Sequence, residues 1–357
     1  MAFYALIMAG GVGTRLWPLS RRDCPKQSLK LFGDRTMFEH AVDRIAPVVQ
    51  PERVYVVAGA EHTESLAAQA PELPPENFIV EPEGRGTAPA IGLGAIHVHR
   101  QDPEAIMAVL TADHFIADVE RFRRVLIAAA QVAAEGRLVT LGITPSSPST
   151  GFGYIKQGDS LDTYEGFSVF RAQRFTEKPS LETALHMVDS GEYSWNSGMF
   201  IWRVDRIMEE FRRYMPDFYV KLAEIEATLG TPGYEATLNR IWPQVVKQTI
   251  DYGVMEHAED VAVIPVDIGW SDVGSWASLV ELLSTDDDAN AIVGPHVGID
   301  TRDTLVFGGK RLIATIGVEG LVVVDTEDAL LICTKEREQE VRTIVRQLEG
   351  RDDTRYL

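Results

Sequence analysis

The first element of the chain is Ala2–Gly11, AFYALIMAGG, and it continues as VGTRLWPLS to Ser20. An apolar run that ends at paired glycines is typical of a buried strand that breaks into a glycine-rich loop. After the strand Ala2–Ala9, the expected strands are Arg53–Gly59, Asn77–Glu81, Ala105–Thr111 and Leu138–Ile143, and the expected helices are Met37–Ile45, Glu61–Ala70, Ala88–Val98 and Asp118–Ala134. This alternation predicts an α/β fold built on a doubly wound, mostly parallel sheet.

In the second half of the chain, strands and helices no longer alternate regularly. A turn-rich insertion after Thr150 precedes a strand at Gly166–Phe175, a helix at Leu181–Ser190, a strand at Gly198–Arg203 and helices from Asp205 to Arg240. Beyond Leu283, a charged linker precedes short apolar runs and a helix from Lys335 to Leu348. We therefore expect a large domain over residues 1–283 and a small β-rich domain over residues 284–357. For the small domain, a short left-handed β-helix and a small sandwich both remain open.

Acidic residues dominate the charge of the chain. The 357 residues include 53 Asp and Glu against 34 Lys and Arg, which gives a net charge of −19. Such a surface repels nucleic-acid backbones and anionic lipids, so neither nucleic acid nor a membrane is an expected partner. An anionic substrate would need cations that gather locally against this average field.

Cysteine content and hydrophobicity indicate the compartment. Cys24 and Cys333 lie far apart and outside any zinc-like spacing, so they predict neither a disulfide framework nor a structural metal site. No run approaches the roughly 20 apolar residues of a membrane-spanning helix, and the N-terminus shows no targeting pattern. We expect a cytoplasmic protein.

Two cations follow the glycine-rich loop. Gly10, Gly11 and Gly13 allow the backbone to approach an anion closely, and Arg15 and Lys26 supply positive charge. The pattern is not the Rossmann fingerprint, which needs a further glycine near Arg15, and it lacks the Gly-Lys-Ser/Thr ending of a P-loop. A plain glycine turn would not account for the clustered cations. We therefore predict a phosphate-binding loop.

The loop motif GGVGTRLWPLS, followed by Pro25-Lys26-Gln27, resembles the motif of the sugar nucleotidyltransferases, and Trp17, Ser20 and Gln27 are similar to the mannose-1-phosphate guanylyltransferase branch. Further segments resemble that branch in order and at compatible spacing: Glu81–Ile91, Thr111–His114, Gly151–Ile155, Phe175–Pro179, Trp195–Phe200 and Gly269–Trp276. Two positions depart from the pattern. Gly86 stands where the family usually has Asn, which bears on a contact to the base or ribose, and Thr111 stands where it often has Pro, which bears only on the backbone.

The resemblance implies a Rossmann-like, GT-A-like fold and the transfer of GMP from GTP to mannose 1-phosphate, with release of pyrophosphate and Mg²⁺ as cofactor. It implies that Arg15 and Lys26 bind the triphosphate and that Lys178 binds the sugar phosphate. It further implies nucleotide binding by Gly10, Gly11, Gly13, Thr14, Glu81, Arg85 and Thr87, sugar binding by Gly153, Glu177 and Asn196, and metal ligation by Asp113 and Asp272.

Some of these residues also have simpler interpretations. Asp113 follows an expected strand, where open parallel sheets bind ligands, but an Asp at this place is as often a helix N-cap. Lys178 precedes a proline, so we expect Glu177 and Lys178 to point to opposite faces of an extended segment, with a surface ion pair as the alternative. His97 and His99 have no third ligand near them in sequence and are expected to be solvated helix residues.

Two alternative functions remain open: the same chemistry with another sugar or nucleotide, and a non-catalytic nucleotide-sensing relative. The chain ends at Leu357 without room for the cupin-type isomerase domain of bifunctional relatives, so isomerase activity is not expected. The short apolar strands after Leu283 would leave exposed edges. We therefore expect the small domain to pack on the larger one or to build a homodimer contact.

Overall fold

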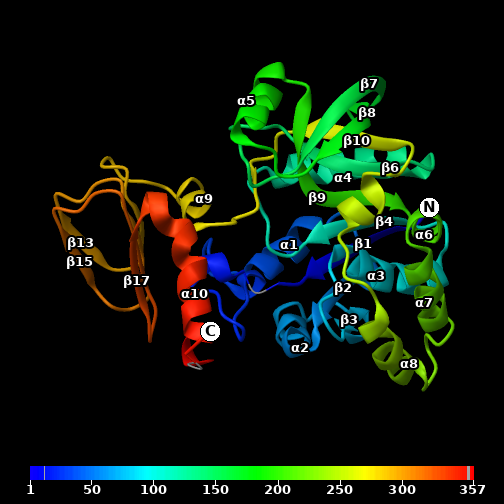
Figure 1. Cartoon of the computed structure of the whole chain (residues 1–357), viewed down its shortest axis with the longest axis horizontal. Helices are drawn as coiled ribbons and strands as arrows, with labels where there is room; N and C mark the ends of the chain where they lie inside the picture. The colour runs from blue at the N-terminus through cyan, green and yellow to red at the C-terminus, as the bar shows by residue number, and fades with distance from the viewer. Residues whose placement is uncertain (12, 352–353) are drawn as a thin grey trace. The chain divides into compact units, whose positions relative to one another are not determined.

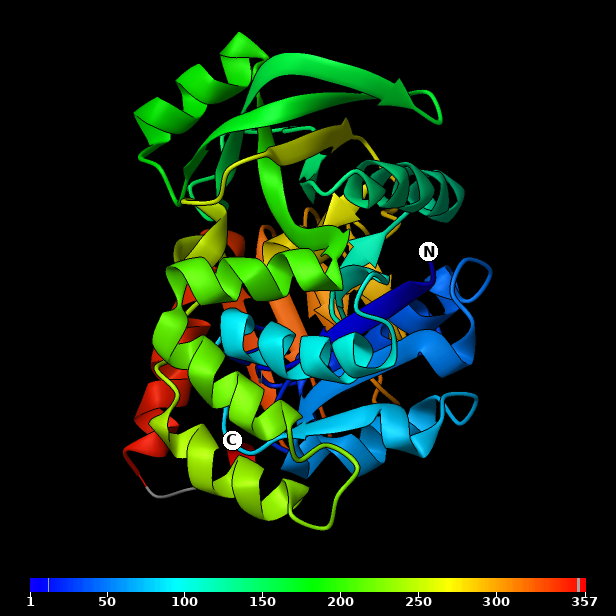
Figure 2. The same cartoon turned by 90° about the vertical axis from the view of Figure 1, so that its right-hand side faces the viewer.

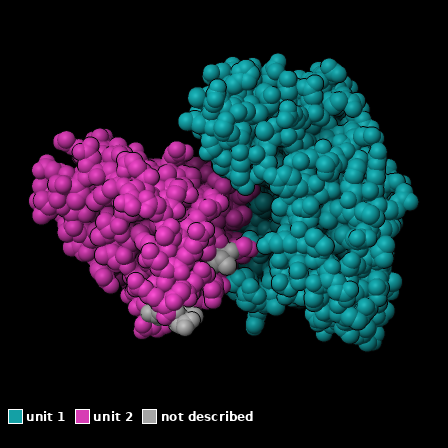
Figure 3. All heavy atoms as spheres, viewed as in Figure 1, with its two compact units in different colours: residues 1–10, 38–112, 116–270 teal, residues 11–37, 113–115, 271–357 magenta. Residues whose placement is uncertain are grey.

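The computed structural model describes residues 1–11, 13–351 and 354–357 (Figure 1). The chain divides into two compact units, coloured separately in Figure 3. The first unit comprises residues 1–10, 38–112 and 116–270, and the second unit comprises residues 11–37, 113–115 and 271–357. The glycine-rich loop and the C-terminal segment therefore belong to the same unit. The predicted domain boundary after Leu283 stays a prediction.

The first unit is built on one large sheet. Its strands are β1 (Phe3–Ala9), β2 (Val54–Gly59), β3 (Phe78–Glu81), β4 (Ile106–Thr111), β6 (Leu138–Ile143), β7 (Tyr154–Tyr164), β8 (Phe167–Thr176), β9 (Tyr193–Arg203) and β10 (Val261–Val266). Among the described residues these nine strands lie in the order β3-β2-β1-β4-β9-β6-β10-β8-β7. β3, β2, β1 and β4 are mutually parallel, as are β6 and β10, whereas β9 runs antiparallel to both β4 and β6. The sheet is therefore more mixed than the sequence pattern predicts.

Helices cover both faces of this sheet. They are α1 (Met37–Ile45), α2 (Ala60–Gln69), α3 (Thr87–Gln101), α4 (Val119–Ala134), α5 (Leu181–Ser190), α6 (Val204–Tyr214), α7 (Pro216–Glu226) and α8 (Tyr234–Ile241). Figure 2 shows α6 and α7 (green) beside α3 (cyan), with which both are in contact, and α8 next to α7. The short strands β5 (Phe115–Ile116) and β11 (Trp270–Ser271) lie where the chain passes between the units. No helix in the described part of the chain is long and apolar enough to cross a membrane.

β1 shows why the sequence reads as a continuous apolar run. Ala5 and Ile7 are buried in the core on one face of the sheet, and Tyr4 and Leu6 are buried in the core on the other. A strand that is covered on both faces needs apolar residues at every position. α3 approaches β1 closely, because a Cβ at Gly94 would lie 2.4 Å from Leu6 Cδ1. Burial of side chains this complete stabilises the fold by about 1.5–3 kcal/mol per large residue.

α3 also corrects the interpretation of two histidines. His97 is partly buried, and its Nε2 lies 3.2 Å from the hydroxyl of Tyr234. Burial lowers the pKa of His97 to about 4. His99 Nδ1 lies 2.6 Å from Glu226 Oε1 on α7. The expectation of solvated residues was wrong, because α7 and α8 pack over the face of α3 that carries them.

The second unit contains a coil of short strands. They are β12 (Ala291–Val293), β13 (His296–Ile299), β14 (Leu305–Phe307), β15 (Ile313–Ile316), β16 (Leu321–Asp325) and β17 (Leu330–Thr334), followed by α10 (Val341–Glu349). β12, β14 and β16 are parallel neighbours in one sheet, β13 and β15 pair in parallel in another, and β17 adds antiparallel to β16. The chain thus alternates between two sheets and returns in parallel each time. This winding is that of a β-helix and not of a hairpin sandwich.

The glycine-rich segment and the β-helix share one core. Trp17 Nε1 donates to the main-chain oxygen of Tyr356 at 2.6 Å, and Trp276 Nε1 donates to the main-chain oxygen of Trp17 at 3.3 Å. Both indoles are buried with Leu305 and Val322 of the β-helix. Trp276 begins α9 (Trp276–Val280), which follows a capping box at Ser275. The C-terminal segment therefore packs on residues 11–37 of the same unit.

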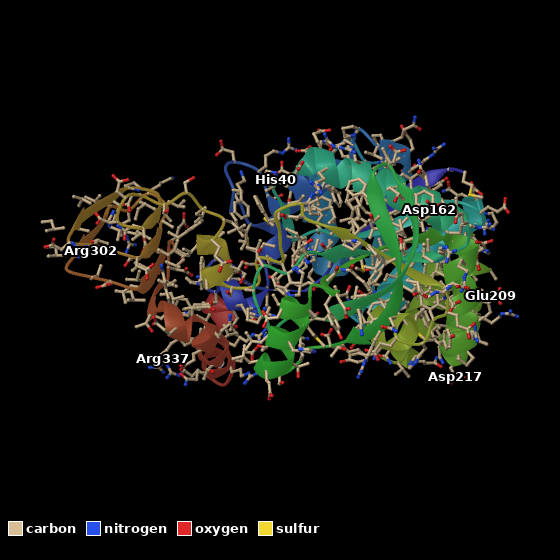
Figure 4. The ribbon with its side chains drawn as sticks, turned by 90° about the horizontal axis from the view of Figure 1, so that it is seen from above. His40, Asp162, Glu209, Asp217, Arg302 and Arg337 are labelled. Carbon is tan, nitrogen blue, oxygen red and sulfur yellow. The ribbon has the colours of Figure 1, made fainter. Side chains whose placement is uncertain are left out.

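Acidic side chains are exposed on the first unit. Asp162, Glu209 and Asp217, labelled in Figure 4, lie on β7, α6 and α7 and are exposed. They contribute to the net charge of −19. Any anion-binding site must therefore be built from locally concentrated cations.

Candidate active site

A polar cavity of about 290 Å³ lies within the second unit. Its lining comes from four stretches that are distant in sequence: Gly13–Leu16, Lys26, Asp113–His114 and Asp272–Gly274, with Arg342 from α10. Arg15, Lys26, Asp113 and Asp272, each predicted from the sequence to act on phosphates or metal, thus meet at one cavity. Asp113 follows β4 by two positions and Asp272 follows β10 by six, and both strands end at the same edge of the sheet.

Lys26 is the central cation of this cavity. Its Nζ donates to Asp113 Oδ2 at 2.9 Å and, through a short contact, to the main-chain oxygen of Asp272. The Lys26 side chain is only 8% exposed, so its charge is compensated by partners and not by bulk water. Gly13 makes room for it: a Cβ there would lie 2.6 Å from Lys26 Cβ, and the φ of +71° also favours glycine.

Arg15 lies beside the same carboxylates. Its Nη1 donates to the main-chain oxygen of Gly274 at 3.1 Å, and no carboxylate lies within ion-pair distance of it in the described part of the chain. Asp272 Oδ1 accepts from the Gly274 N–H at 3.0 Å. A Cβ at Gly274 would lie 2.6 Å from Asp272 Oδ2 and 2.9 Å from Arg15 Nη1. Gly274 is therefore required for the close approach of the other two residues.

The two carboxylates differ electrostatically. Burial opposes ionisation of Asp113, but the neighbouring charges of Lys26 and His114 outweigh it, so the pKa of Asp113 lies below its usual value. Burial raises the pKa of Asp272, only partly offset by Lys26 and Arg15, and the charge of Asp113 raises it further. The carboxylates of Asp113 and Asp272 therefore repel each other, and a bound cation would relieve this repulsion.

This pair of oxygen donors suits Mg²⁺. Mg²⁺ prefers carboxylate, water and phosphate oxygens, and it commonly takes only one or two ligands from the protein. Among residues 1–11, 13–351 and 354–357 no group of three or more His, Cys, Asp or Glu is arranged to hold a metal. Two carboxylates at one cavity fit an ion that arrives with a polyphosphate better than a permanently held one. Asp113 is not a helix cap, because the strand β5 follows it and the N-cap of α4 is Asp118.

The remaining loop residues surround this cavity to different degrees. Gly11 has a φ of +89°, a conformation suited to glycine, and no heavy atom would lie within 4 Å of a Cβ at Gly10 or Gly11. Thr14 is exposed at the start of a short 3-10 helix, Thr14–Leu16, and lines the cavity. Among the described residues of the loop, Gly10 and Gly11 expose their backbone and Thr14 adds a hydroxyl group.

A second predicted group comes together within the first unit. The Asn196 N–H donates to the main-chain oxygen of Gly153 at 2.8 Å, and a Cβ at Gly153 would lie 2.5 Å from Glu177 Oε2. Asn196 Nδ2 donates to Asp251 Oδ1 at 2.6 Å. The three residues expected to bind sugar are thus neighbours, and Asp251 joins them. Asp251 was not among the residues predicted from the sequence, although it stands in the partly polar segment Gln248–Asp251 between two apolar stretches.

Asp251 and Lys178 complete the charges of this group. Burial raises the pKa of Asp251, although the hydrogen bond from Asn196 opposes the shift. Lys178 Nζ lies 3.0 Å from Glu177 Oε1 and is 64% exposed. The two side chains therefore meet, and the expectation that they point to opposite faces was wrong. Lys178 has a φ of +46°, so the segment leaves the extended conformation on which that expectation depended.

The segment Glu81–Thr87 is shaped by its own hydrogen bonds. Glu81 Oε1 accepts from the Arg85 N–H at 2.9 Å, and Thr87 Oγ1 accepts from the Ile250 N–H at 2.9 Å. The Arg85 guanidinium donates to Glu83 Oε2 at 2.6 Å. Gly86 has a φ of +90°, and a Cβ there would lie 2.4 Å from the main-chain oxygen of Gln248. The backbone at Gly86 therefore leaves no space for the side chain of the Asn that the family usually has at this position.

The predicted site residues are thus distributed over both units. Arg15, Lys26, Asp113 and Asp272 belong to the second unit, and Glu81, Arg85, Thr87, Gly153, Glu177, Lys178 and Asn196 belong to the first. Trp17 is one of the residues that resemble the mannose-1-phosphate guanylyltransferase branch. It is buried in the core of the second unit and does not line the cavity.

Comparisons with known proteins identify the families that the chain resembles. Residues 4–289 match the family model "Nucleotidyl transferase", and residues 294–348 match the "MannoseP isomerase/GMP-like beta-helix domain". These matches confirm the predicted fold class and, for the small domain, the β-helix over the sandwich.

Individual relatives match this chain over nearly its whole length and about three quarters of their own. A mannose-1-phosphate guanylyltransferase of Escherichia coli (strain K12) is 41% identical over 362 residues, which cover 99% of this chain and 75% of that protein. The xanthan biosynthesis protein XanB of Xanthomonas campestris pv. campestris (strain B100) is 40% identical, covering 97% of this chain and 73% of that protein. A crystal structure of a mannose-1-phosphate geranyltransferase from Thermus thermophilus has a TM-score of 0.89 and 38% identity, covering 98% of this chain and all of that one.

Proposed function

The chain belongs to the nucleotidyl transferase family, and from this premise we propose that it transfers GMP from GTP to α-D-mannose 1-phosphate, giving GDP-mannose and pyrophosphate. The observation that carries the proposal is the cavity in which Lys26 contacts both Asp113 and Asp272 and Arg15 lies beside them. These residues combine fixed cations with a paired carboxylate site, which a polyphosphate and its divalent ion require together. The identity of the relatives supports mannose and GTP as the substrates.

The reaction is an in-line displacement at phosphorus. An oxygen of the sugar phosphate forms a bond to the α-phosphorus of GTP, and the bond from that phosphorus to the bridging oxygen of the β-phosphate breaks, so that pyrophosphate leaves. A phosphate monoester has its second pKa near about 6 and is largely dianionic at neutral pH, so no general base is needed. Catalysis then depends on positioning and on charge neutralisation.

In this scheme Arg15 and Lys26 bind the triphosphate. Asp113 and Asp272 would hold Mg²⁺, which supplies positive charge between the phosphate oxygens when bound. The partial burial of both carboxylates strengthens these interactions relative to water. Gly10, Gly11 and Gly13 keep the loop open to the phosphates, and Thr14 contributes an exposed hydroxyl.

The sugar phosphate is assigned to the group in the first unit. Glu177, Asn196 and Asp251 offer carboxylate and amide groups suited to sugar hydroxyls, and Gly153 leaves space beside them. Lys178, exposed and paired with Glu177, would exchange part of that ion pair for the sugar phosphate. Surface ion pairs are weak, at about 0–1 kcal/mol, so the exchange costs little.

Glu81, Arg85 and Thr87 are proposed to shape the nucleotide pocket. Their hydrogen-bond partners are backbone groups and Glu83, so a contact to the nucleotide would come from the loop they hold in place. We propose a cytoplasmic location, which the two free thiols Cys24 and Cys333 suit.

A coupled pyrophosphate-release assay tests the proposal. GTP with mannose 1-phosphate should exceed ATP or UTP with the same sugar, and GTP with glucose 1-phosphate, by at least about tenfold in kcat/KM, equivalent to about 1.4 kcal/mol at the transition state. Equal or faster turnover of another pair would replace the assignment with that pair. Absence of turnover with every pair would favour the nucleotide-sensing alternative.

A further inference from the structure

Among the described residues that line the cavity, Arg342 alone comes from the segment after Leu283. It lies in the first turn of α10, and it lines the cavity together with Arg15, Lys26, Asp113 and Asp272. The sequence motifs assign no chemical role to residues after Leu283. Only the folding of the glycine-rich loop onto the C-terminal segment brings Arg342 to this cavity.

The position of α10 is fixed by packing. Val341 and Val345, on either side of Arg342 in sequence, are buried in the core of the second unit. The helix packs against the short helix Thr14–Leu16 that carries Arg15. Just before α10, Glu338 Oε2 accepts from the Trp276 N–H at 3.1 Å in a buried contact. The backbone that carries Arg342 is therefore held against the loop on two sides.

Arg342 has no carboxylate partner, in contrast to its neighbours. Within residues 13–351 and 354–357 its guanidinium makes no ion pair, whereas Arg337 pairs with Glu340 at 2.6 Å and Lys335 pairs with Asp303 at 2.6 Å. The acidic group that acts on it electrostatically is Glu338. Both oxygens of Glu338 are already engaged, by the Trp276 N–H and by Gln339 Nε2.

Arg342 and Arg15 form an uncompensated pair of like charges. Burial, together with the charges of Arg15 and Arg346, lowers the pKa of Arg342. Arg15 itself bonds to a main-chain oxygen and not to a carboxylate. Bringing two guanidinium groups to one cavity is unfavourable unless an anion joins them, and a chain with a net charge of −19 has many carboxylates that could have neutralised them.

We propose that Arg342 binds the β- and γ-phosphates of the nucleotide, the part that leaves as pyrophosphate. This assignment rests on the proposed function. Lys26 is held between the two aspartates and therefore belongs to the metal end of the site. Arg15 and Arg342 are the cavity cations without a carboxylate partner in the described chain, so they are the groups available to the end of the triphosphate away from those carboxylates. Two planar guanidinium groups bind phosphate oxygens in a bidentate manner.

The β-helix thus contributes directly to the reaction. Negative charge develops on the leaving pyrophosphate in the transition state, and a cation aimed at it accelerates the step. The product GDP-mannose lacks the pyrophosphate, so it does not contact Arg342. Removal of this side chain should therefore affect GTP and pyrophosphate but spare mannose 1-phosphate and GDP-mannose.

The test uses the full chain with Arg342→Gln and a matched control, Arg346→Gln. Arg346 stands one turn further along α10, is likewise exposed, and does not line the cavity. Both substitutions remove one positive charge from the same helix. Arg342 is exposed, so the variant should keep its melting temperature within about 2 °C, which is checked first.

Titration with inorganic pyrophosphate in the presence of Mg²⁺ gives the primary readout. We expect the Kd of Arg342→Gln to rise at least about tenfold, that of Arg346→Gln to change less than about threefold, and Arg342→Lys to recover part of the loss. In steady state, kcat/KM for GTP should fall at least about tenfold in Arg342→Gln, while KM for mannose 1-phosphate and Kd for GDP-mannose stay within about twofold.

Wild-type affinity of Arg342→Gln for pyrophosphate would overturn the proposal. An equal loss in Arg346→Gln would overturn it as well, because the effect would then come from the general field of α10. A matching loss of GDP-mannose affinity would assign Arg342 to another part of the substrate. If the wild type does not turn over GTP with mannose 1-phosphate, the proposed function fails, but the pyrophosphate titration still decides the role of Arg342.

Discussion

Lys26 shows how one residue can organise a site in an acidic protein. Its ammonium group contacts the side chain of Asp113 and the main chain of Asp272, so it holds two segments together that lie far apart in sequence. The same contacts leave both carboxylates at the cavity. A lysine in this position partly neutralises the carboxylates, and a divalent ion with its phosphates would share them with it.

Loss of either carboxylate charge should remove most of the activity. Asp113→Asn and Asp272→Asn should each keep the fold but lose at least about a hundredfold in kcat, about 2.7 kcal/mol at the transition state, because the Mg²⁺ that these carboxylates would hold loses a ligand. The measurement is kcat over a Mg²⁺ titration, which should also show weakened dependence on the metal. Asp217→Asn, exposed on α7, is the control (Figure 4). Near-wild-type turnover at limiting Mg²⁺ in either site variant would remove that residue from the ligand set.

Gly274 offers a steric test of the same site. In Gly274→Ala the new Cβ would lie 2.6 Å from Asp272 Oδ2 and 2.9 Å from Arg15 Nη1, so one of these side chains must move. We expect kcat/KM for GTP to fall by about tenfold to a hundredfold with little change in melting temperature. The matched control is Gly309→Ala in the same unit, where a Cβ would meet no heavy atom within 4 Å. Unchanged kinetics in Gly274→Ala would mean that the distance between Arg15 and Asp272 is not critical.

At the scale of elements, the strands of the parallel half of the sheet could be predicted from the sequence, because they are apolar at every position. β1, β2, β4 and β6 begin and end within a residue or so of the predicted runs. β9 is different: it is predicted from Gly198 but begins at Tyr193, because its first residues pair with both β6 and β7. The periodicity of a single segment does not reveal which strands it pairs with.

Part of the site could be predicted because some of its residues belong to recognisable sequence motifs. Arg15 and Asp272 stand in polar or glycine-rich motifs and can be recognised in the sequence. Asp251 begins a π-helical turn and Arg342 lies in the first turn of α10, so neither stands in a glycine-rich motif. Only tertiary contacts bring Asp251 to Asn196 and Arg342 to the cavity.

The packing of α3 predicts a pH dependence of stability. The pKa of His97 is lowered to about 4, so between about pH 6.5 and pH 4 the unfolded chain binds more protons at this residue than the folded one. Stability should therefore fall as the pH decreases through this window, by up to about 3 kcal/mol from His97. Urea unfolding from pH 7 to pH 4.5 should show a flatter dependence in His97→Gln than in the wild type. Parallel curves for the two proteins would show that His97 becomes protonated without cost.

At the scale of the whole molecule, the shared core of the second unit predicts what truncation does. Deletion of residues 286–357 would remove Leu305, Phe307, Val322 and Val341 from around Trp17 and Trp276. Large buried side chains contribute about 2–5 kcal/mol each when lost, so the glycine-rich loop should lose its structure. We expect the truncated chain to aggregate or to lose affinity for pyrophosphate, measured by light scattering and calorimetry. A monodisperse truncated chain with wild-type affinity would show that the loop folds without the β-helix.

The assembly of the second unit from residues 11–37, 113–115 and 271–357 has a consequence for the order of events during synthesis. The loop that carries Arg15 and Lys26 leaves the ribosome well before its packing partners α9, the β-helix and α10. Contacts between segments this distant in sequence cannot form until α10 has been synthesised. The growing chain therefore carries the glycine-rich loop without its packing partners over a long stretch of translation, and the second unit can be completed only when α10 has emerged.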